Sequence, residues 1–119
     1  MKRKILVIED DADIRQVISN VLIDEGFETI LCKNEKNIFE VILLNNPDVI
    51  LLDVIRPTQQ GTELCRTIKA AETTKHIPII VLSTHSQIDD VKKICADDIV
   101  KKPFDIQLLI DVVNEQICA

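Results

Sequence analysis

The stretch Asp48-Val49-Ile50-Leu51-Leu52-Asp53 decides the fold of this chain. Its four consecutive apolar residues are typical of a short strand that is buried on both faces. The strand pattern ends at Asp53, because Pro57 and Gly61 follow and do not continue a strand. Open α/β sheets keep their ligand crevice at the carboxyl ends of their strands, so Asp53 is a candidate functional residue. Taken alone, an aspartate at this position is equally compatible with a turn or a helix cap.

Similar apolar runs recur along the chain and alternate with helical patterns. We expect strands over residues 4–8, 28–32, 48–53, 78–82 and 98–101. Apolar residues at helical spacing predict helices from about residue 13 to Gly26 and over residues 38–44, 61–71, 87–95 and 105–118. In the first helix, the residues expected to face inward are Ile14, Val17, Ile18, Val21 and Leu22. Strict alternation of strand and helix predicts a parallel sheet with right-handed crossovers and helices on both faces.

Composition excludes several classes of protein. The length of 119 residues suits one domain, and a net charge of −6 argues against direct binding of nucleic acid by this domain. No apolar run is long enough for a membrane span or a signal peptide. The four cysteines form no Cys-x-x-Cys pair and no spacing that supports a zinc site, so we expect reduced thiols in a cytoplasmic protein.

Polar residues stand where the expected strands end. They are Glu9, Asp10, Asp53, Ser83, Thr84 and Lys102. Three carboxylates in one crevice repel one another unless a cation neutralises them, and an acidic, all-oxygen pocket suits Mg²⁺. The lysine and the hydroxyl are suited to an anion held on one carboxylate. Because aspartate can attack phosphorus to form an acyl phosphate, the pattern favours a phosphoryl acceptor.

Four motifs carry a family resemblance. They are the run from Ile5 to Asp11, the spacing Asp53-x-x-x-Pro57-x-x-x-Gly61, the run from Pro78 to Ser83, and residues 96–104 with Lys101-Lys102-Pro103-Phe104. Together they resemble the receiver domain of bacterial response regulators, and the resemblance covers essentially the whole chain. It implies one receiver domain over residues 1–119, with any output domain absent from this chain. It also implies a flavodoxin-like, doubly wound (βα)5 fold whose five-stranded parallel sheet has the order 2-1-3-4-5.

The resemblance also implies a role for each strand-end residue. Asp53 is expected to take a phosphoryl group from the phosphohistidine of a histidine kinase or phosphotransfer protein. Mg²⁺ is expected to be held by Glu9, Asp10, Asp53 and the backbone carbonyl of Ile55. Ser83, Thr84 and Lys102 are expected to contact the phosphoryl group. The domain is then a signalling switch rather than an enzyme, with only self-phosphorylation and autodephosphorylation as chemistry.

Some positions depart from the family pattern. Thr84 stands where a small residue is usual, Cys95 replaces a glycine, and Ile99 replaces an aromatic residue at the switch position. The span from Ser83 to Lys102 is also shorter than usual, by about one helical turn. We expect a short fourth helix whose order changes on phosphorylation. The face made by the fourth helix, fifth strand and fifth helix is expected to bind an output domain, a downstream protein or, on phosphorylation, a second copy.

Two alternatives belong to other functional classes. The first is a receiver-like adaptor that binds partners without phosphorylation, which the altered positions favour and the intact acidic set opposes. The second is a flavin-binding redox domain on the same fold. It is opposed by the absence of a Ser/Thr/Gly-rich phosphate loop after the first strand and of any Tyr or Trp to stack on the flavin.

Overall fold

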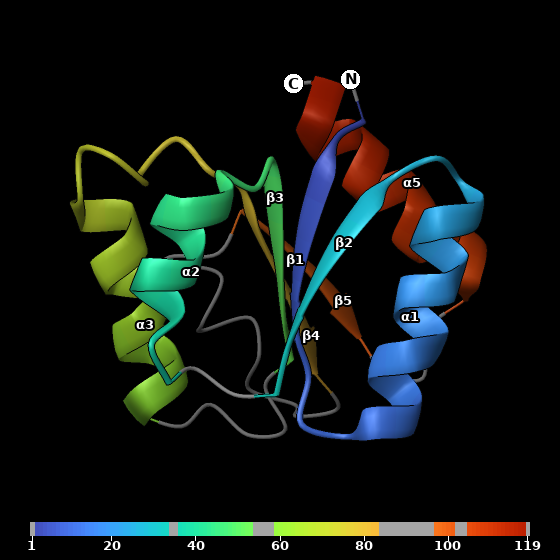
Figure 1. Cartoon of the computed structure of the whole chain (residues 1–119), viewed down its shortest axis with the longest axis horizontal. Helices are drawn as coiled ribbons and strands as arrows, with labels where there is room; N and C mark the ends of the chain where they lie inside the picture. Colours follow the sequence, from blue (N-terminus) through green and yellow to red (C-terminus); the bar gives the residue numbers. More distant parts are fainter. Residues whose placement is uncertain (1, 34–35, 54–58, 84–96, 102–104, 119) are drawn as a thin grey trace.

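The chain folds as a parallel five-stranded sheet between two layers of helices (Figure 1). The structure is a computed structural model, and it describes residues 2–33, 36–53, 59–83, 97–101 and 105–118. The strands are β1 (Lys4–Ile8), β2 (Glu28–Cys32), β3 (Val49–Asp53), β4 (Ile79–Ser83) and β5 (Asp98–Lys101). The helices are α1 (Ala12–Asp24), α2 (Ile38–Asn45), α3 (Gln59–Ala70) and α5 (Ile106–Cys118). The predicted helix over residues 87–95 lies outside the described residues.

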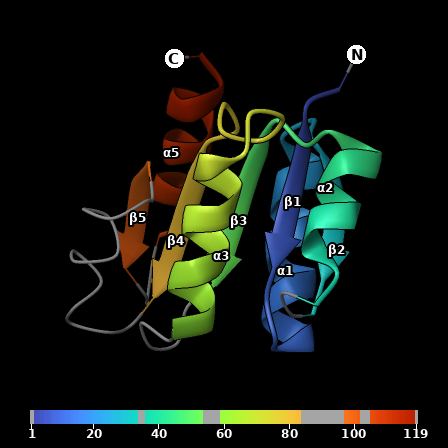
Figure 2. The same cartoon turned by 90° about the vertical axis from the view of Figure 1, so that its left-hand side faces the viewer.

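The sheet confirms the predicted topology. All four strand pairs are parallel, and the order is β2-β1-β3-β4-β5 (Figure 2). All strands therefore run in one direction, and their carboxyl ends form one edge, at the bottom of Figure 1. In the described part of the chain, α1 and α5 cover one face of the sheet and α2 and α3 cover the other.

Side chains of alternating direction on the strands form the two halves of the core. Toward α2 and α3 the sheet presents Leu6, Ile8, Ile50, Leu52, Ile79 and Val81, which pack on Ile38, Ile42, Cys65 and Ile68. Toward α1 and α5 it presents Ile5, Val7, Val49, Leu51, Ile80, Leu82 and Val100, which pack on Ile18, Leu22, Leu109, Val112 and Val113. Burial on both faces explains why the central strands read as unbroken apolar runs.

Helix boundaries follow local chemistry. The Asp11 side chain accepts hydrogen bonds from the backbone N–H groups of Asp13 (2.9 Å) and Ile14 (3.1 Å), so α1 begins at Ala12. Gly26 ends the α1 region with φ of +94°, a conformation that glycine adopts without strain. The third helix begins at Gln59, two residues before the predicted start at Gly61, since a glycine lowers helix propensity without preventing a helix.

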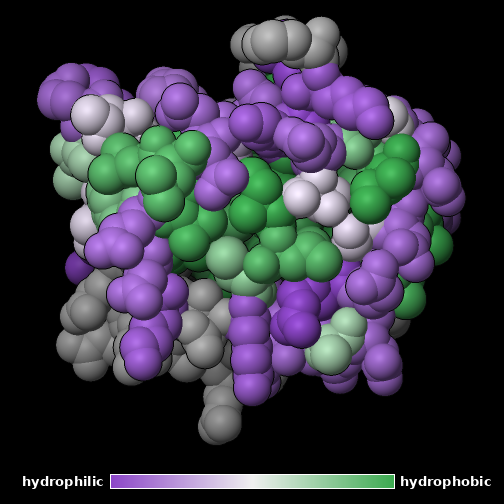
Figure 3. All heavy atoms as spheres, viewed as in Figure 1, coloured by the Kyte–Doolittle hydropathy of each residue, from purple (hydrophilic) through white to green (hydrophobic). Residues whose placement is uncertain are grey.

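Two expectations about side chains were wrong, the inward orientation of Ile14 and Val17 and the reduced state of all four cysteines. Ile14 and Val17 are 38% and 54% exposed, because only the stripe through Ile18 and Leu22 faces the sheet. Leu44 is 84% exposed at the end of the short helix α2, and Figure 3 shows apolar surface over that helix. Cys32 is a free thiol, as expected, but Cys65 is disulfide-bonded.

Candidate functional site

The β1–α1 connection brings two carboxylates to the carboxyl edge of the sheet. Glu9 follows β1 directly and is 2% exposed, whereas Asp10 is exposed to solvent. The connection between β1 and α1 has only three residues, and the third, Asp11, caps α1; we call Glu9, Asp10 and Asp11 the acidic turn. A buried and an exposed carboxylate therefore lie side by side in sequence at this edge.

The strand register aligns Asp53 with this turn. Ile8 of β1 is opposite Leu52 of β3, and the same register continued by one residue sets Glu9 beside Asp53. Asp53 is the last residue of β3 and pairs with Leu82 of β4. The backbone thus brings Glu9, Asp10 and Asp53 to adjacent strand ends, as predicted. The side chain of Asp53 lies outside the described part.

For the remaining predicted site residues, the structure gives either the backbone position alone or no position. Ser83 is the last residue of β4 and is opposite Lys101 of β5, at the same sheet edge as Asp53. Ile99 lies in the middle of β5 opposite Val81. Their backbones are described but their side chains are not. Ile55, Thr84 and Lys102 lie outside the described residues.

The backbone of Glu9 is held from two directions. Its N–H donates to the carbonyl of Cys32, the last residue of β2, at 3.0 Å. Its carbonyl accepts a hydrogen bond from Nη1 of Arg15 on α1 at 2.7 Å. The turn that carries the two acids is therefore connected both to the neighbouring strand and to the helix that follows it.

The contact of Arg15 with the backbone of Glu9 was not predicted, although the position of Arg15 in the sequence is compatible with it. It stands four residues after the cap Asp11, one helical turn along α1, so its long side chain can extend back toward the turn. The nearby Cys32 thiol has a raised pKa because burial disfavours the thiolate, and the positive charge of Arg15 partly offsets this shift.

The donor chemistry of this edge fits Mg²⁺. Among the described side chains no group of three or more His, Cys, Asp and Glu gathers as a metal site, and the third predicted carboxylate, Asp53, is not among them. The two acids that are described offer only oxygen ligands, and one of them is open to solvent. Oxygen donors with access to water are what Mg²⁺ requires, since it retains part of its hydration shell.

An apolar groove lies between α1 and α5. Its volume is about 200 Å³, and its lining consists of Asp13, Ile14, Val17, Ile18, Val21, Ile106 and Leu109. Asp13 belongs to the first turn of α1, so the groove begins beside the acidic turn.

Of the described helices, none is long and apolar enough to cross a membrane.

Comparisons with known proteins agree with this architecture. A family model for the response regulator receiver domain matches residues 5–114. The chain is similar to the transcriptional regulatory protein YxdJ of Bacillus subtilis, with 34% identity over 117 residues that cover 96% of this chain and 50% of that protein. It is also similar to the phosphate regulon transcriptional regulatory protein PhoB of Pseudomonas aeruginosa, with 37% identity over 105 residues, 86% of this chain and 46% of that protein.

Solved structures show the same relationship. The receiver domain of the Francisella response regulator 1452 matches with a TM-score of 0.85 and 30% identity over 98% of each chain. The chemotaxis protein CheY4 of Vibrio cholerae matches with a TM-score of 0.85 and 25% identity, covering 97% of this chain and 98% of that one. The chain spans about half the length of the curated relatives named above.

Proposed function

The chain belongs to the response regulator receiver domain family, whose members are phosphorylation-dependent signalling switches, and from this premise we propose that Asp53 is its phosphoacceptor. The observation that carries the assignment is the parallel register of β1 and β3, in which Ile8 lies opposite Leu52 and each is followed directly by an acidic residue, Glu9 and Asp53. In the proposed reaction a carboxylate oxygen of Asp53 attacks phosphorus. The P–N bond of a phosphohistidine breaks, and the imidazole nitrogen keeps the bonding electron pair.

The turn after β1 and the end of β3 together supply the residues that would hold Mg²⁺. We assign this role to the carboxylates of Glu9, Asp10 and Asp53 and to the backbone carbonyl of Ile55. When bound, Mg²⁺ neutralises negative charge on the carboxylates and the phosphoryl oxygens. The burial of Glu9 supports the assignment, because a carboxylate at 2% exposure is stabilised by a neighbouring cation.

The next two strands supply the groups that respond to the phosphoryl group. Ser83 ends β4 beside Lys101 of β5, which supports a role for its hydroxyl as a donor to a phosphoryl oxygen. Thr84 and Lys102 follow these residues directly in sequence, and we assign Lys102 as the cation that pairs with the phosphoryl group. Ile99 replaces the aromatic switch residue, and a β-branched aliphatic side chain has few rotamers with which to signal.

The phosphodonor is proposed to be a histidine kinase or a phosphotransfer protein. Its histidine must reach the carboxyl edge of the sheet, and the apolar groove between α1 and α5 begins at that edge, beside Asp13. Val17 is 54% exposed in the groove lining, which supports contact with an apolar helix of the donor.

The proposal also includes the target on which the phosphorylated domain acts. The relatives include the DNA-binding response regulator MtrA of Mycobacterium tuberculosis, of which the matched part covers 46%. We propose that the phosphorylated domain acts in the cytoplasm on an output domain, a downstream protein or a second copy, through the face that includes β5 and α5. In the described residues no observation favours the alternative of an adaptor that works without phosphorylation.

Exposure to acetyl phosphate with Mg²⁺, followed by intact-mass measurement, tests the proposal. The wild type should gain the mass of one phosphoryl group, and both Asp53→Asn and chelation of Mg²⁺ should abolish the gain. The same experiment reports self-phosphorylation from a small donor and, after the donor is removed, autodephosphorylation. A mass gain that persists in Asp53→Asn would contradict the assignment.

A further inference from the structure

Arg15 makes a contact that the phosphoacceptor role does not account for. Its guanidinium Nη1 donates to the carbonyl of Glu9 at 2.7 Å, a short hydrogen bond from a charged donor. The Arg15 side chain is half-buried, and α1, which carries it, is capped by Asp11. The guanidinium donor therefore comes from a helix whose first turn is held in place by the Asp11 cap.

The contact controls the orientation of a peptide unit at the site. The carbonyl of Glu9 and the N–H of Asp10 belong to the same peptide plane, which rotates as one body. Since the N–H of Glu9 is bonded to Cys32 and its carbonyl to Arg15, both backbone polar groups of Glu9 have fixed partners. These two hydrogen bonds therefore fix the orientation of the peptide unit that joins Glu9 to Asp10.

The positive charge of Arg15 and its hydrogen bond to Glu9 should have opposite effects on the affinity for Mg²⁺. A guanidinium close to Glu9 and Asp10 lowers the local affinity for a cation, because like charges repel. If charge alone mattered, removal of Arg15 would raise the affinity for Mg²⁺. If the hydrogen bond matters more, the same removal would lower it. The sign of the change therefore separates the two effects.

We propose that Arg15 is a positioning residue for Mg²⁺ binding, which holds the Glu9–Asp10 peptide so that both carboxylates are presented together. This inference rests on the proposed function, because it takes Glu9 and Asp10 as the magnesium ligands. Arg15 acts through the backbone of Glu9 and has no contact of its own with the metal or the phosphoryl group in this scheme.

The test is the dissociation constant for Mg²⁺, measured on the whole chain by NMR titration of the Asp10 and Asp11 amide signals with MgCl₂. Arg15→Met should weaken binding roughly tenfold or more, as is usual when a group that orients a ligand is lost. Labelling by acetyl phosphate at saturating Mg²⁺ should fall by a smaller factor, because excess metal restores occupancy. Circular dichroism verifies that each variant is folded.

Lys33→Met is the matched control. Lys33 is exposed and follows β2 directly, so its replacement removes the same charge without removing the bond to Glu9. Its affinity for Mg²⁺ should equal or slightly exceed that of the wild type. If Arg15→Met does not fold, Arg15→Lys replaces it, and its affinity should lie below that of the wild type.

The inference is overturned if the Arg15 variant binds Mg²⁺ as tightly as the wild type, or if Lys33→Met loses as much affinity. Failure of the proposed function is distinguishable from this outcome. In that case the wild type itself would take no label from acetyl phosphate, whatever the effect of Arg15 on the binding of Mg²⁺.

Discussion

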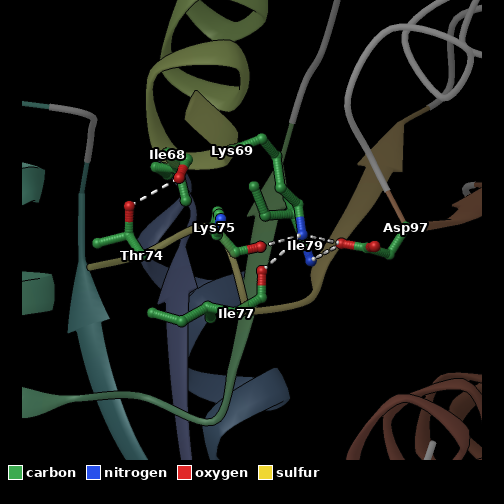
Figure 4. Close-up of polar contacts among 7 residues, drawn as sticks. All are labelled: Ile68, Lys69, Thr74, Lys75, Ile77, Ile79 and Asp97. Atoms are coloured by element: carbon green, nitrogen blue, oxygen red, sulfur yellow. Dashed lines mark hydrogen bonds and ion pairs between the residues drawn. The ribbon is translucent and has the colours of Figure 1, made fainter. Parts of the chain in front are cut away.

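The Lys69 ammonium nitrogen lies 2.6 Å from Oδ2 of Asp97, and the same carboxylate oxygen accepts the backbone N–H of Ile79 at 2.8 Å (Figure 4). Lys69 also donates to the carbonyl of Ile77 at 2.8 Å, and the N–H of Asp97 donates to the carbonyl of Ile79 at 2.8 Å. Asp97 precedes β5 directly, so this network joins the start of β5 to β4 and to the end of α3.

Loss of the Asp97 carboxylate should destabilise the fold. Asp97→Ala removes the ion pair and the acceptor for Ile79, and we expect it to lower the free energy of unfolding by about 2 kcal/mol. Urea unfolding followed by circular dichroism measures the change. Glu72→Gln is the control, because the Glu72–Lys75 ion pair is exposed and should contribute less than about 1 kcal/mol. Equal losses for the two variants would contradict a special role for Asp97.

The Cys32 thiol should ionise only at high pH. Burial raises its pKa above the ordinary value, so its alkylation by iodoacetamide should reach half its maximal rate at a higher pH than in an unfolded peptide. The stability linked to this group is fully present below the unfolded pKa and is lost as pH rises through the folded pKa. Peptide mapping after alkylation at a series of pH values measures the ionisation of this cysteine alone.

A second expectation concerns the same thiol. Arg15→Met should raise the pKa of Cys32 further, since the positive charge of Arg15 opposes the effect of burial. A pKa of Cys32 at or below that of the unfolded peptide would contradict the first expectation, and a pKa that Arg15→Met leaves unchanged or lowers would contradict the second.

Ser83 should matter more for the conformational change that follows phosphorylation than for phosphorylation itself. Ser83→Ala retains every proposed magnesium ligand, so acetyl phosphate should still label it. We expect the variant to lose most of the backbone chemical-shift change that phosphorylation causes in β4 and β5, because it lacks the hydroxyl that we propose as a donor to the phosphoryl group. A change of full size in Ser83→Ala, measured by NMR, would remove Ser83 from the switch.

The groove between α1 and α5 should matter for a protein donor but not for a small one. Val17→Glu places a charge in the apolar lining and should slow phosphotransfer from a purified histidine kinase that phosphorylates the wild type. Labelling by acetyl phosphate should be unchanged. Leu44→Glu is the control, since Leu44 is 84% exposed on α2 and lies outside the groove lining. Equal slowing by both substitutions would count against the groove as the docking surface.

The sheet was predictable because its central strands are buried on both faces. Such strands read as continuous apolar runs, and Val49–Asp53 and Ile79–Ser83 lie within one residue of their predicted bounds. Strand order came from the family resemblance, since alternation of strands and helices alone does not distinguish between the doubly wound orders. The placement of Glu9 and Asp53 at adjacent strand ends followed from parallel pairing.

Three features could not be predicted, because a sequence pattern does not specify which groups a side chain contacts or how much of a helix face the sheet covers. The contact of Asp97 with Lys69 is one of them, because nothing local in the sequence shows that these two residues lie side by side. Arg15 was missed for a similar reason, since its partner is a backbone carbonyl, which every residue has. The exposure of Ile14 and Val17 was missed because helical spacing identifies an apolar stripe but not how much of it the sheet covers.

Localisation of the phosphoryl group tests the central claim most directly. After labelling with acetyl phosphate, borohydride reduces an aspartyl phosphate to homoserine, and tandem mass spectrometry of the peptides identifies the position. We predict homoserine at position 53 and none at positions 10, 11 or 48. Homoserine at another position, or a labelled chain with intact aspartate at position 53, would contradict the claim that Asp53 is the phosphoacceptor.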